Sequence, residues 1–217
     1  MNKLVGIIVM VILSLCVLQA VVAESGLPQY QFAEGDWKLM GNRLYQMDTK
    51  DPLAKVNIRA PQMGTRVYSF NVKYVSGAED LHGGFGIHVF ADSVWPRKSW
   101  GSGKSYLLWL NYDANPVSKD IPKGFSAQVY ESKTHTYMKL MKSIDLNKYA
   151  YLTNKISPNV KIPVKIKVNG DTGLVKVYSP MDPNYYFKFY LGNTKSLQGN
   201  WVALRTNSLA LSFGMDN

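Results

Sequence analysis

The residues best suited to chemistry are aromatic, amide and cationic side chains from the middle of the chain and from near its end. Strand-like alternation places some of them opposite the apolar residues of their strands, and the others lie in the segment before Ser105. The set comprises His88, Trp95, Arg97, Trp100, Trp109, Asn111, Tyr130 and Arg205. Aromatic faces bind the C–H surfaces of sugars, and amides and Arg hydrogen-bond to hydroxyls. The set therefore predicts a saccharide groove; the alternative is that the tryptophans only fill a core or fix a loop.

Motifs for other chemistries are incomplete. The segment 101–105 resembles a phosphate-binding loop, but Lys98 stands where that motif needs its first glycine. His82-Gly83-Gly84 is similar to an oxyanion loop, yet the chain has no Gly-x-Ser-x-Gly elbow to use it. These glycines are instead expected to give a turn and a strand whose bare positions admit a close neighbour. The three histidines are not spaced as zinc ligands, and the sequence predicts no cofactor.

The N-terminus has the pattern of a secretory signal. A short basic start precedes an apolar run over residues 4–22, and residues 21–23 are small or β-branched. We expect cleavage after Ala23, because Gln19 interrupts the run. An uncleaved anchor is the alternative, since the run approaches the ~18 to 20 apolar residues that span a bilayer. A lipoprotein acylated on Cys16 is disfavoured by the large residue before it.

Residues 1–23 are thus the predicted signal peptide and residues 24–217 a single mature domain. The mature part carries 24 Lys and Arg against 15 Asp and Glu and has no cysteine. Its lysines occur singly, without a basic run or a recognition helix, so no nucleic acid partner is predicted. An exported chain without disulfides or glycosylation sequons favours the periplasm or surface of a bacterium. No transmembrane segment is predicted after cleavage, and the charge suits an anionic envelope polymer or an acidic glycan.

A β-hairpin is the most strongly specified local structure. Over Ile162–Tyr178, valines and isoleucines alternate with lysines on both sides of the turn Asn169–Gly173. An Asn-Gly pair and a second glycine reverse the chain at little steric cost. The hairpin should have one apolar face and one face bearing ammonium groups, and another layer must cover the apolar face.

Shorter alternating segments continue along the chain. Residues 37–47 predict two short strands around a Gly-Asn turn, and Val56–Ala60 forms a piece that we expect Pro61 to close. Residues 106–112 are apolar at nearly every position, which is typical of a strand covered on both faces. The only predicted helix spans residues 145–152. About a dozen short strands with almost no helix predict an all-β sandwich or barrel.

Several of these segments together resemble the concanavalin A-like lectin/glucanase domains. The resemblance is carried by Gly35-Asp36-Trp37, Gly41-Asn42-Arg43-Leu44, the hairpin Val164 to Tyr178 and the closing segment Gly199 to Ser208. It extends to bacterial jelly-roll domains assigned to 3-keto-disaccharide hydrolysis and to laminin G-like modules. It implies an antiparallel jelly-roll sandwich of two curved sheets, with sugars on the concave sheet or its rim. Related lectins carry calcium sites, but the scattered aspartates of this chain give calcium no support.

Glycoside hydrolysis requires two carboxylates beside the scissile bond. The resemblance implies that a glucanase would carry a strand of the type Glu-x-Asp-x-x-Glu. The mature chain has only the glutamates Glu24, Glu34, Glu79 and Glu131, and none begins this pattern. The sequence therefore favours a non-catalytic domain. A glycoside-processing enzyme stays an alternative, with Asp113 as its candidate carboxylate.

Two hypotheses about the function follow, one for a binding domain and one for a structural protein. The first is an exported domain that binds a carbohydrate or an envelope polymer without catalysis. The second is a structural or assembly protein that binds an envelope protein through a basic, aromatic face. Both require the candidate side chains to share one open, curved surface.

Overall fold

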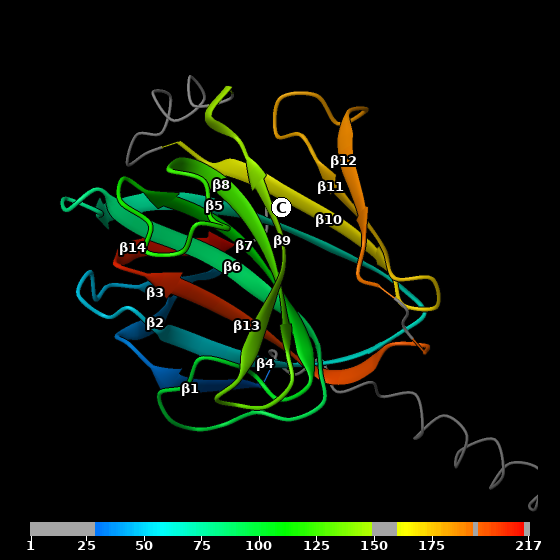
Figure 1. The fold of residues 1–217 in the computed structure, drawn as a ribbon. Helices are drawn as coiled ribbons and strands as arrows, with labels where there is room; N and C mark the ends of the chain where they lie inside the picture. The colour runs from blue at the N-terminus through cyan, green and yellow to red at the C-terminus, as the bar shows by residue number, and fades with distance from the viewer. Residues whose placement is uncertain (1–28, 149–159, 193–194, 215–217) are drawn as a thin grey trace, which may run out of the picture.

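Two stacked antiparallel sheets of seven strands each make up the fold (Figure 1). The computed structural model describes residues 29–148, 160–192 and 195–214. Sheet A contains, in spatial order, β1 (Tyr30–Glu34), β4 (Ala54–Met63), β13 (Gln198–Asn207), β6 (His82–Ala91), β7 (Ser105–Asp113), β8 (Gly124–Ser132) and β9 (Met138–Asp145). Sheet B contains, in spatial order, β12 (Tyr186–Tyr190), β11 (Leu174–Tyr178), β10 (Ile162–Asn169), β5 (Thr65–Gly77), β14 (Leu209–Gly214), β3 (Arg43–Gln46) and β2 (Trp37–Met40). The predicted all-β, antiparallel jelly-roll sandwich is confirmed.

The predicted hairpin forms β10 and β11 of sheet B. Lys167 pairs with Lys176 across the two strands. The turn is held by Asn169, whose side-chain oxygen accepts hydrogen bonds from the backbone N–H groups of Asp171 (3.0 Å) and Thr172 (2.9 Å). Gly173 takes a φ of 69°, which explains why the turn uses a glycine at this position.

The hydrophobic core lies between the two sheets. Alternate residues of the hairpin point into it, and Val168 and Val175 are completely buried. Phe213 of sheet B joins the layers, because its ring lies 6.4 Å from that of Phe85 in sheet A. It also contacts the rings of Trp37 (6.0 Å) and Phe70 (6.3 Å) within its own sheet. Aromatic contacts of this kind add to the free energy gained by burial.

Two local predictions were wrong. Pro61 does not close a strand, because β4 continues through it to Met63. The ladder between β4 and β13 is irregular there: Arg59 pairs with Trp201 and Gln62 with Gly199, so the missing proline N–H falls within a bulge. The predicted helix over 145–152 fails at its start, since Asp145 is the last residue of β9.

Some predictions fall outside the described residues. The expected signal peptide and its cleavage site belong to residues 1–28, and residues 149–152 of the predicted helix belong to the undescribed range 149–159. Among the residues that are described, no helix has the length and apolar character to cross a membrane.

We predict that Phe213→Ala lowers the free energy of unfolding by about 3–5 kcal/mol, because it removes a buried ring from the junction of the sheets. Urea unfolding followed by fluorescence measures the change. Val117→Ala is the control, since Val117 is fully exposed and should change stability by less than about 0.5 kcal/mol. A loss no larger than that of the control would show that Phe213 does not join the layers.

Candidate functional site

The structure brings five of the eight predicted site residues together on four adjacent strands of sheet A. Arg205 lies on β13, His88 on β6, Trp109 and Asn111 on β7, and Tyr130 on β8. They alternate along their strands with core residues, which are Leu204 on β13, Ile87 and Val89 on β6, Leu108 on β7 and Val129 on β8. We call this surface the outer face of sheet A. The period-two alternation thus predicted which side chains share a face.

The other three predicted residues lie in the loop that joins β6 to β7, residues 92–104. Trp100 and Trp95 are exposed, at 58% and 44% respectively, and Arg97 is exposed as well. The ring of Trp95 lies 5.4 Å from that of His135, which belongs to the connection between β8 and β9. Both indoles are exposed, and each also contacts a residue outside the loop, so the alternative that these two tryptophans fix the loop stands beside the binding interpretation.

Two glycines of β6 make room for the indole of Trp109. Gly86 is the direct cross-strand partner of Trp109, and Gly84 pairs with Asn111. A Cβ atom at Gly84 would lie 2.6 Å from the Trp109 ring, and one at Gly86 would lie 2.8 Å from it. The indole therefore lies across bare backbone, as the glycine pattern predicts. Its Nε1 donates a 3.1 Å hydrogen bond to Asn111 Oδ1.

Arg205 contacts two aromatic rings. Its guanidinium carbon lies 4.9 Å from the ring centre of Trp100 and 5.7 Å from that of Trp109. It also donates a 2.5 Å hydrogen bond from a terminal nitrogen to the carbonyl oxygen of Trp100. Cation–π contacts of a desolvated Arg are stronger than exposed ones. Arg205 therefore ties the loop tryptophan to the sheet.

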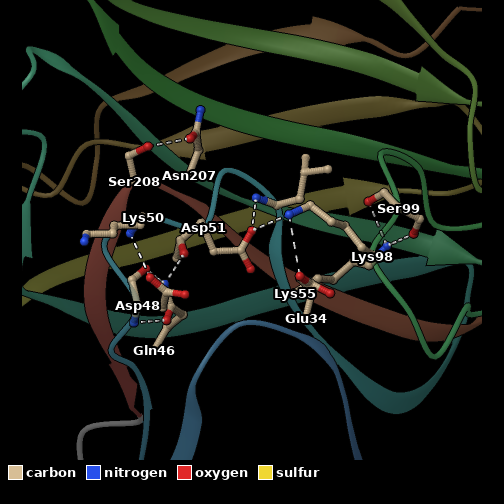
Figure 2. A network of polar contacts seen from close by, with 12 residues as sticks. Glu34, Gln46, Asp48, Lys50, Asp51, Lys55, Lys98, Ser99, Asn207 and Ser208 are labelled. Atoms are coloured by element: carbon tan, nitrogen blue, oxygen red, sulfur yellow. Dashed lines mark hydrogen bonds and ion pairs between the residues drawn. The ribbon is translucent and has the colours of Figure 1, made fainter.

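Two lysines fix the same loop (Figure 2). Lys55 Nζ donates to the carbonyl oxygens of Ser99 (3.3 Å) and Gly101 (2.8 Å) and to the Ser99 hydroxyl. Lys98 forms ion pairs with Glu34 Oε1 at 3.6 Å and Asp51 Oδ1 at 3.5 Å. The loop is thus attached to β4, to the end of β1 and to the connection between β3 and β4, all of which are distant from it in sequence.

The expectation of an open surface is wrong at the centre of this face. Lys55 and His88 are completely buried, Arg205 is only 2% exposed, and the predicted ligand-binding residues Asn111 and Trp109 are buried as well, at 6% and 9%. The contacts of Lys55 with Ser99 and Gly101, and of Arg205 with Trp100, place the loop over them. The accessible part of the site is therefore the exposed surface of the loop and the half-buried Tyr130 beside it.

The buried cations Lys55 and Arg205 have lowered pKa values, because burial disfavours their charged forms. Burial lowers the pKa of Arg205 to about 10, and burial followed by repulsion from Arg205 lowers the pKa of Lys55 to about 8. Burial, then Arg205 and Lys55, hold the pKa of His88 well below its usual value of 6.5. Within the described part of the chain, neither Lys55 nor Arg205 forms an ion pair with a carboxylate.

Three buried polar atoms on this face have no hydrogen-bond partner among the described residues. They are Asn57 Oδ1, His88 Nε2 and Arg205 Nε. Asn57 and His88 both pair with Ala203, so they flank a small residue on the strand between them. Unsatisfied buried groups are costly and uncommon in folded proteins. Because Asn57, His88 and Arg205 are buried, a ligand on the exposed surface of the loop does not reach these atoms.

Sequence reasoning missed Lys55 and Asn57. The alternation of polar and apolar residues in Lys55-Val56-Asn57-Ile58 indicated a strand with one polar face. It did not indicate that this strand lies beside the one carrying Arg205, because their pairing joins positions 150 residues apart.

A shallow hollow of about 300 Å³ lies where β6 begins and β7 ends. His82 and Asp113 line it, and His82 Nε2 lies 3.8 Å from Asp113 Oδ2. Within the described residues, no group of three or more His, Cys, Asp or Glu side chains could hold a metal ion.

Comparisons with known proteins identify the fold. No family model matches the chain, and no curated protein is similar to it in sequence. The carbohydrate-binding module CBM66 from Bacillus subtilis is similar in structure, with a TM-score of 0.53 at 11% identity over 86% of this chain and 92% of that chain. A Bacillus subtilis protein of unknown function with a galectin-like fold gives a TM-score of 0.49 at 12% identity, covering 86% of each chain. The metal-free Emp46p carbohydrate recognition domain gives 0.47 at 13% identity, covering 85% of each. The similarity to CBM66 agrees with the lectin-like jelly roll predicted from the sequence.

We predict that the protein loses stability below pH 6.5 because of His88. The folded state keeps His88 neutral, whereas the unfolded chain protonates it near its usual pKa of 6.5. This contribution is complete above pH 6.5 and disappears as the pH falls toward the lowered folded-state pKa. Between pH 7.5 and 5.5 the free energy of unfolding should decrease by about 1.4 kcal/mol from this group.

Urea unfolding of the wild type and of His88→Gln at both pH values measures the contribution of His88. The variant should lose this part of the pH dependence. His82→Gln should retain it, since the side chain of His82 is 41% exposed. Equal pH dependence in the wild type and in His88→Gln would contradict the prediction.

Proposed function

We propose that this protein is an exported, non-catalytic domain that binds a carbohydrate or another envelope polymer at the outer face of sheet A. The observation that carries the proposal is the contact of Arg205 with Trp100 and Trp109. It fixes an exposed indole over a polar face, and a rigid aromatic surface loses little entropy when a sugar ring stacks on it.

Tyr130 supplies a half-buried hydroxyl on the outer face of sheet A, and the buried Gln128 and Ser126 hold it. Tyr130 OH donates a 2.6 Å hydrogen bond to Gln128 Oε1, and Gln128 Nε2 donates to Ser126 Oγ at 3.0 Å. These linked side chains are held in place before a ligand arrives. Trp95 and Arg97, in the same loop as Trp100, are exposed and extend the candidate surface.

The fold supports this proposal without deciding it. CBM66, which has the same architecture, is named as a carbohydrate-binding module. Its identity to this chain is 11%, so the support for sugar binding comes from the residues on the outer face of sheet A. The periplasm or the surface of a bacterium is the proposed location, from the signal-like N-terminus and the absence of cysteine in residues 24–217.

A glycoside-processing enzyme is the less favoured candidate. Its residues would be His82 and Asp113, which face one another at the hollow beside β6 and β7. The glutamate pattern of the glucanases is missing from the sequence. Turnover of a chromogenic glycoside that disappears in Asp113→Asn would favour this alternative over pure binding.

We predict that Trp100→Ala weakens glycan binding at least about 30-fold, the effect of removing a central aromatic anchor. The melting temperature should fall by no more than about 2–4 °C, because the side chain is largely exposed and loses mainly its contact with Arg205. A glycan array with the purified protein identifies a ligand among neutral and acidic glycans, and titration with that ligand measures the change in affinity.

Tyr190→Ala is the matched control, because Tyr190 is an exposed aromatic residue of sheet B. It should bind the glycan like the wild type. No binding to any glycan, together with co-purification of a protein partner, would instead support a structural or assembly role. Unfolding of Trp100→Ala would place Trp100 in the core and remove the proposed site.

A further inference from the structure

Most of the net positive charge carried by the described strands lies on sheet B. The seven strands of this sheet, as the structure describes them, contain no Asp or Glu at all. The same strands carry six lysines: Lys38, Lys73, Lys165, Lys167, Lys176 and Lys188. The strands of sheet A, in contrast, contain both acidic and basic residues. The excess of positive charge in the chain is therefore not spread evenly over its surface.

Register gathers four of these lysines on the outer face of the hairpin end of sheet B. Lys167, Lys176 and Lys188 are direct cross-strand neighbours on β10, β11 and β12. Lys165 lies two residues from Lys167, on the same face. Adjacent strands are about 4.8 Å apart, and like charges placed directly opposite one another destabilise a sheet. Among the described residues, none of these three lysines forms an ion pair with a carboxylate, so the row is a cost to folding that an anionic partner would offset.

Tyrosines accompany these lysines on the same face. Lys165 Nζ lies 4.9 Å above the ring of Tyr178, and Lys176 Nζ lies 4.2 Å from the ring of Tyr186 and 3.1 Å from its hydroxyl. Tyr190, at the end of the edge strand β12, is 64% exposed. Lysine and tyrosine both combine an apolar body with a polar tip, which suits the boundary between water and lipid.

The exposed cations of the sheet are lysines and not arginines. Arg43 is buried and hydrogen-bonded to Asn71 and Ser212, and Arg66 is half-buried. Arginine recognises single carboxylates and phosphates through paired hydrogen bonds, whereas lysine acts as a point charge. A lysine surface therefore fits a diffuse array of negative charges better than one acidic group held in a groove.

We propose that the outer face of sheet B docks on an anionic lipid bilayer. The lysines that face outward without an acidic neighbour in the described strands lie on β10, β11 and β12, and half-buried Lys73 on β5 continues the surface, whereas Lys38 on β2 pairs with Asp36 at 3.1 Å. Lysines near an anionic bilayer are attracted by its negative potential, and the tyrosines of β11 and β12 enter the headgroup region. The inference does not depend on the proposed glycan site, which lies on the opposite sheet. A docked protein would turn its loop tryptophans away from the membrane.

Vesicle sedimentation with the full chain tests the proposal. The protein is mixed with vesicles of phosphatidylcholine alone and of phosphatidylcholine with an equal amount of phosphatidylglycerol. The apolar run over residues 4–22 can bind any bilayer, so the readout is the difference between the two vesicles. We expect preferential binding to the anionic vesicles, and its loss in about 1 M salt, where the Debye length is about 3 Å.

The decisive variant is Lys167→Glu/Lys188→Glu. It places a glutamate on each side of Lys176, so cross-strand attraction replaces repulsion and the fold should be at least as stable. Its preference for anionic vesicles should fall at least about 30-fold, because each of the two lysines contributes roughly a fivefold increase in affinity. Lys119→Glu/Lys142→Glu makes the same change of charge at exposed lysines outside sheet B and should keep most of the preference.

Three outcomes would overturn the proposal. One is equal binding to neutral and anionic vesicles, and another is an equal loss of preference in both double variants. The third is binding to soluble polygalacturonate without binding to anionic vesicles, which would assign the lysine face to an acidic polysaccharide. Unchanged glycan binding in Lys167→Glu/Lys188→Glu would show that the two faces act separately.

Discussion

The structure depends on one constraint: every strand must bury one of its two faces between the sheets. Side chains alternate with a period of two, so a slip of one residue would move the apolar set of a strand to the outside. Val168 and Val175 are completely buried by this arrangement, and Phe213 closes the space between the layers. The burial of one face also decides which residues appear on the other. Both outer faces of the sandwich are therefore consequences of the core.

The two outer faces carry different residues, because the core constrains only the side chains that point inward. On sheet A the outer positions hold bare glycines, amides and Trp109, and a loop covers their centre. On sheet B the outer positions near the edge hold lysines and tyrosines, and Lys176 and Tyr186 contact one another. The sandwich thus has one face whose cations are covered by a loop and one face that carries exposed lysines, and each of the two proposed partners has a surface of its own. Charge acts over a longer range than stacking, so the basic face would orient the molecule before the aromatic face binds.

Local and long-range features differ in how far the sequence predicts them. The hairpin was predictable because Asn169 and Gly173 specify its turn and the alternation on both sides specifies its faces. The shared face of His88, Trp109 and Arg205 followed from the same alternation, once the strands were assumed to be neighbours. The bulge that accommodates Pro61 was not predictable, since it depends on the irregular partner strand β13. The burial of His88 was not predictable either, because no periodic pattern in the sequence shows where the loop before β7 packs.

The attachment of that loop explains why cations are buried on the outer face of sheet A. A loop of 13 residues between β6 and β7 has no ladder of its own, so its carbonyl groups need donors from elsewhere. Lys55 and Arg205 supply them, at Ser99, Trp100 and Gly101. Burying these charges costs free energy, as the lowered pKa values of about 8 and about 10 show. These contacts fix the loop, and a fixed loop holds the exposed indole of Trp100 in one place, which the proposed glycan site requires.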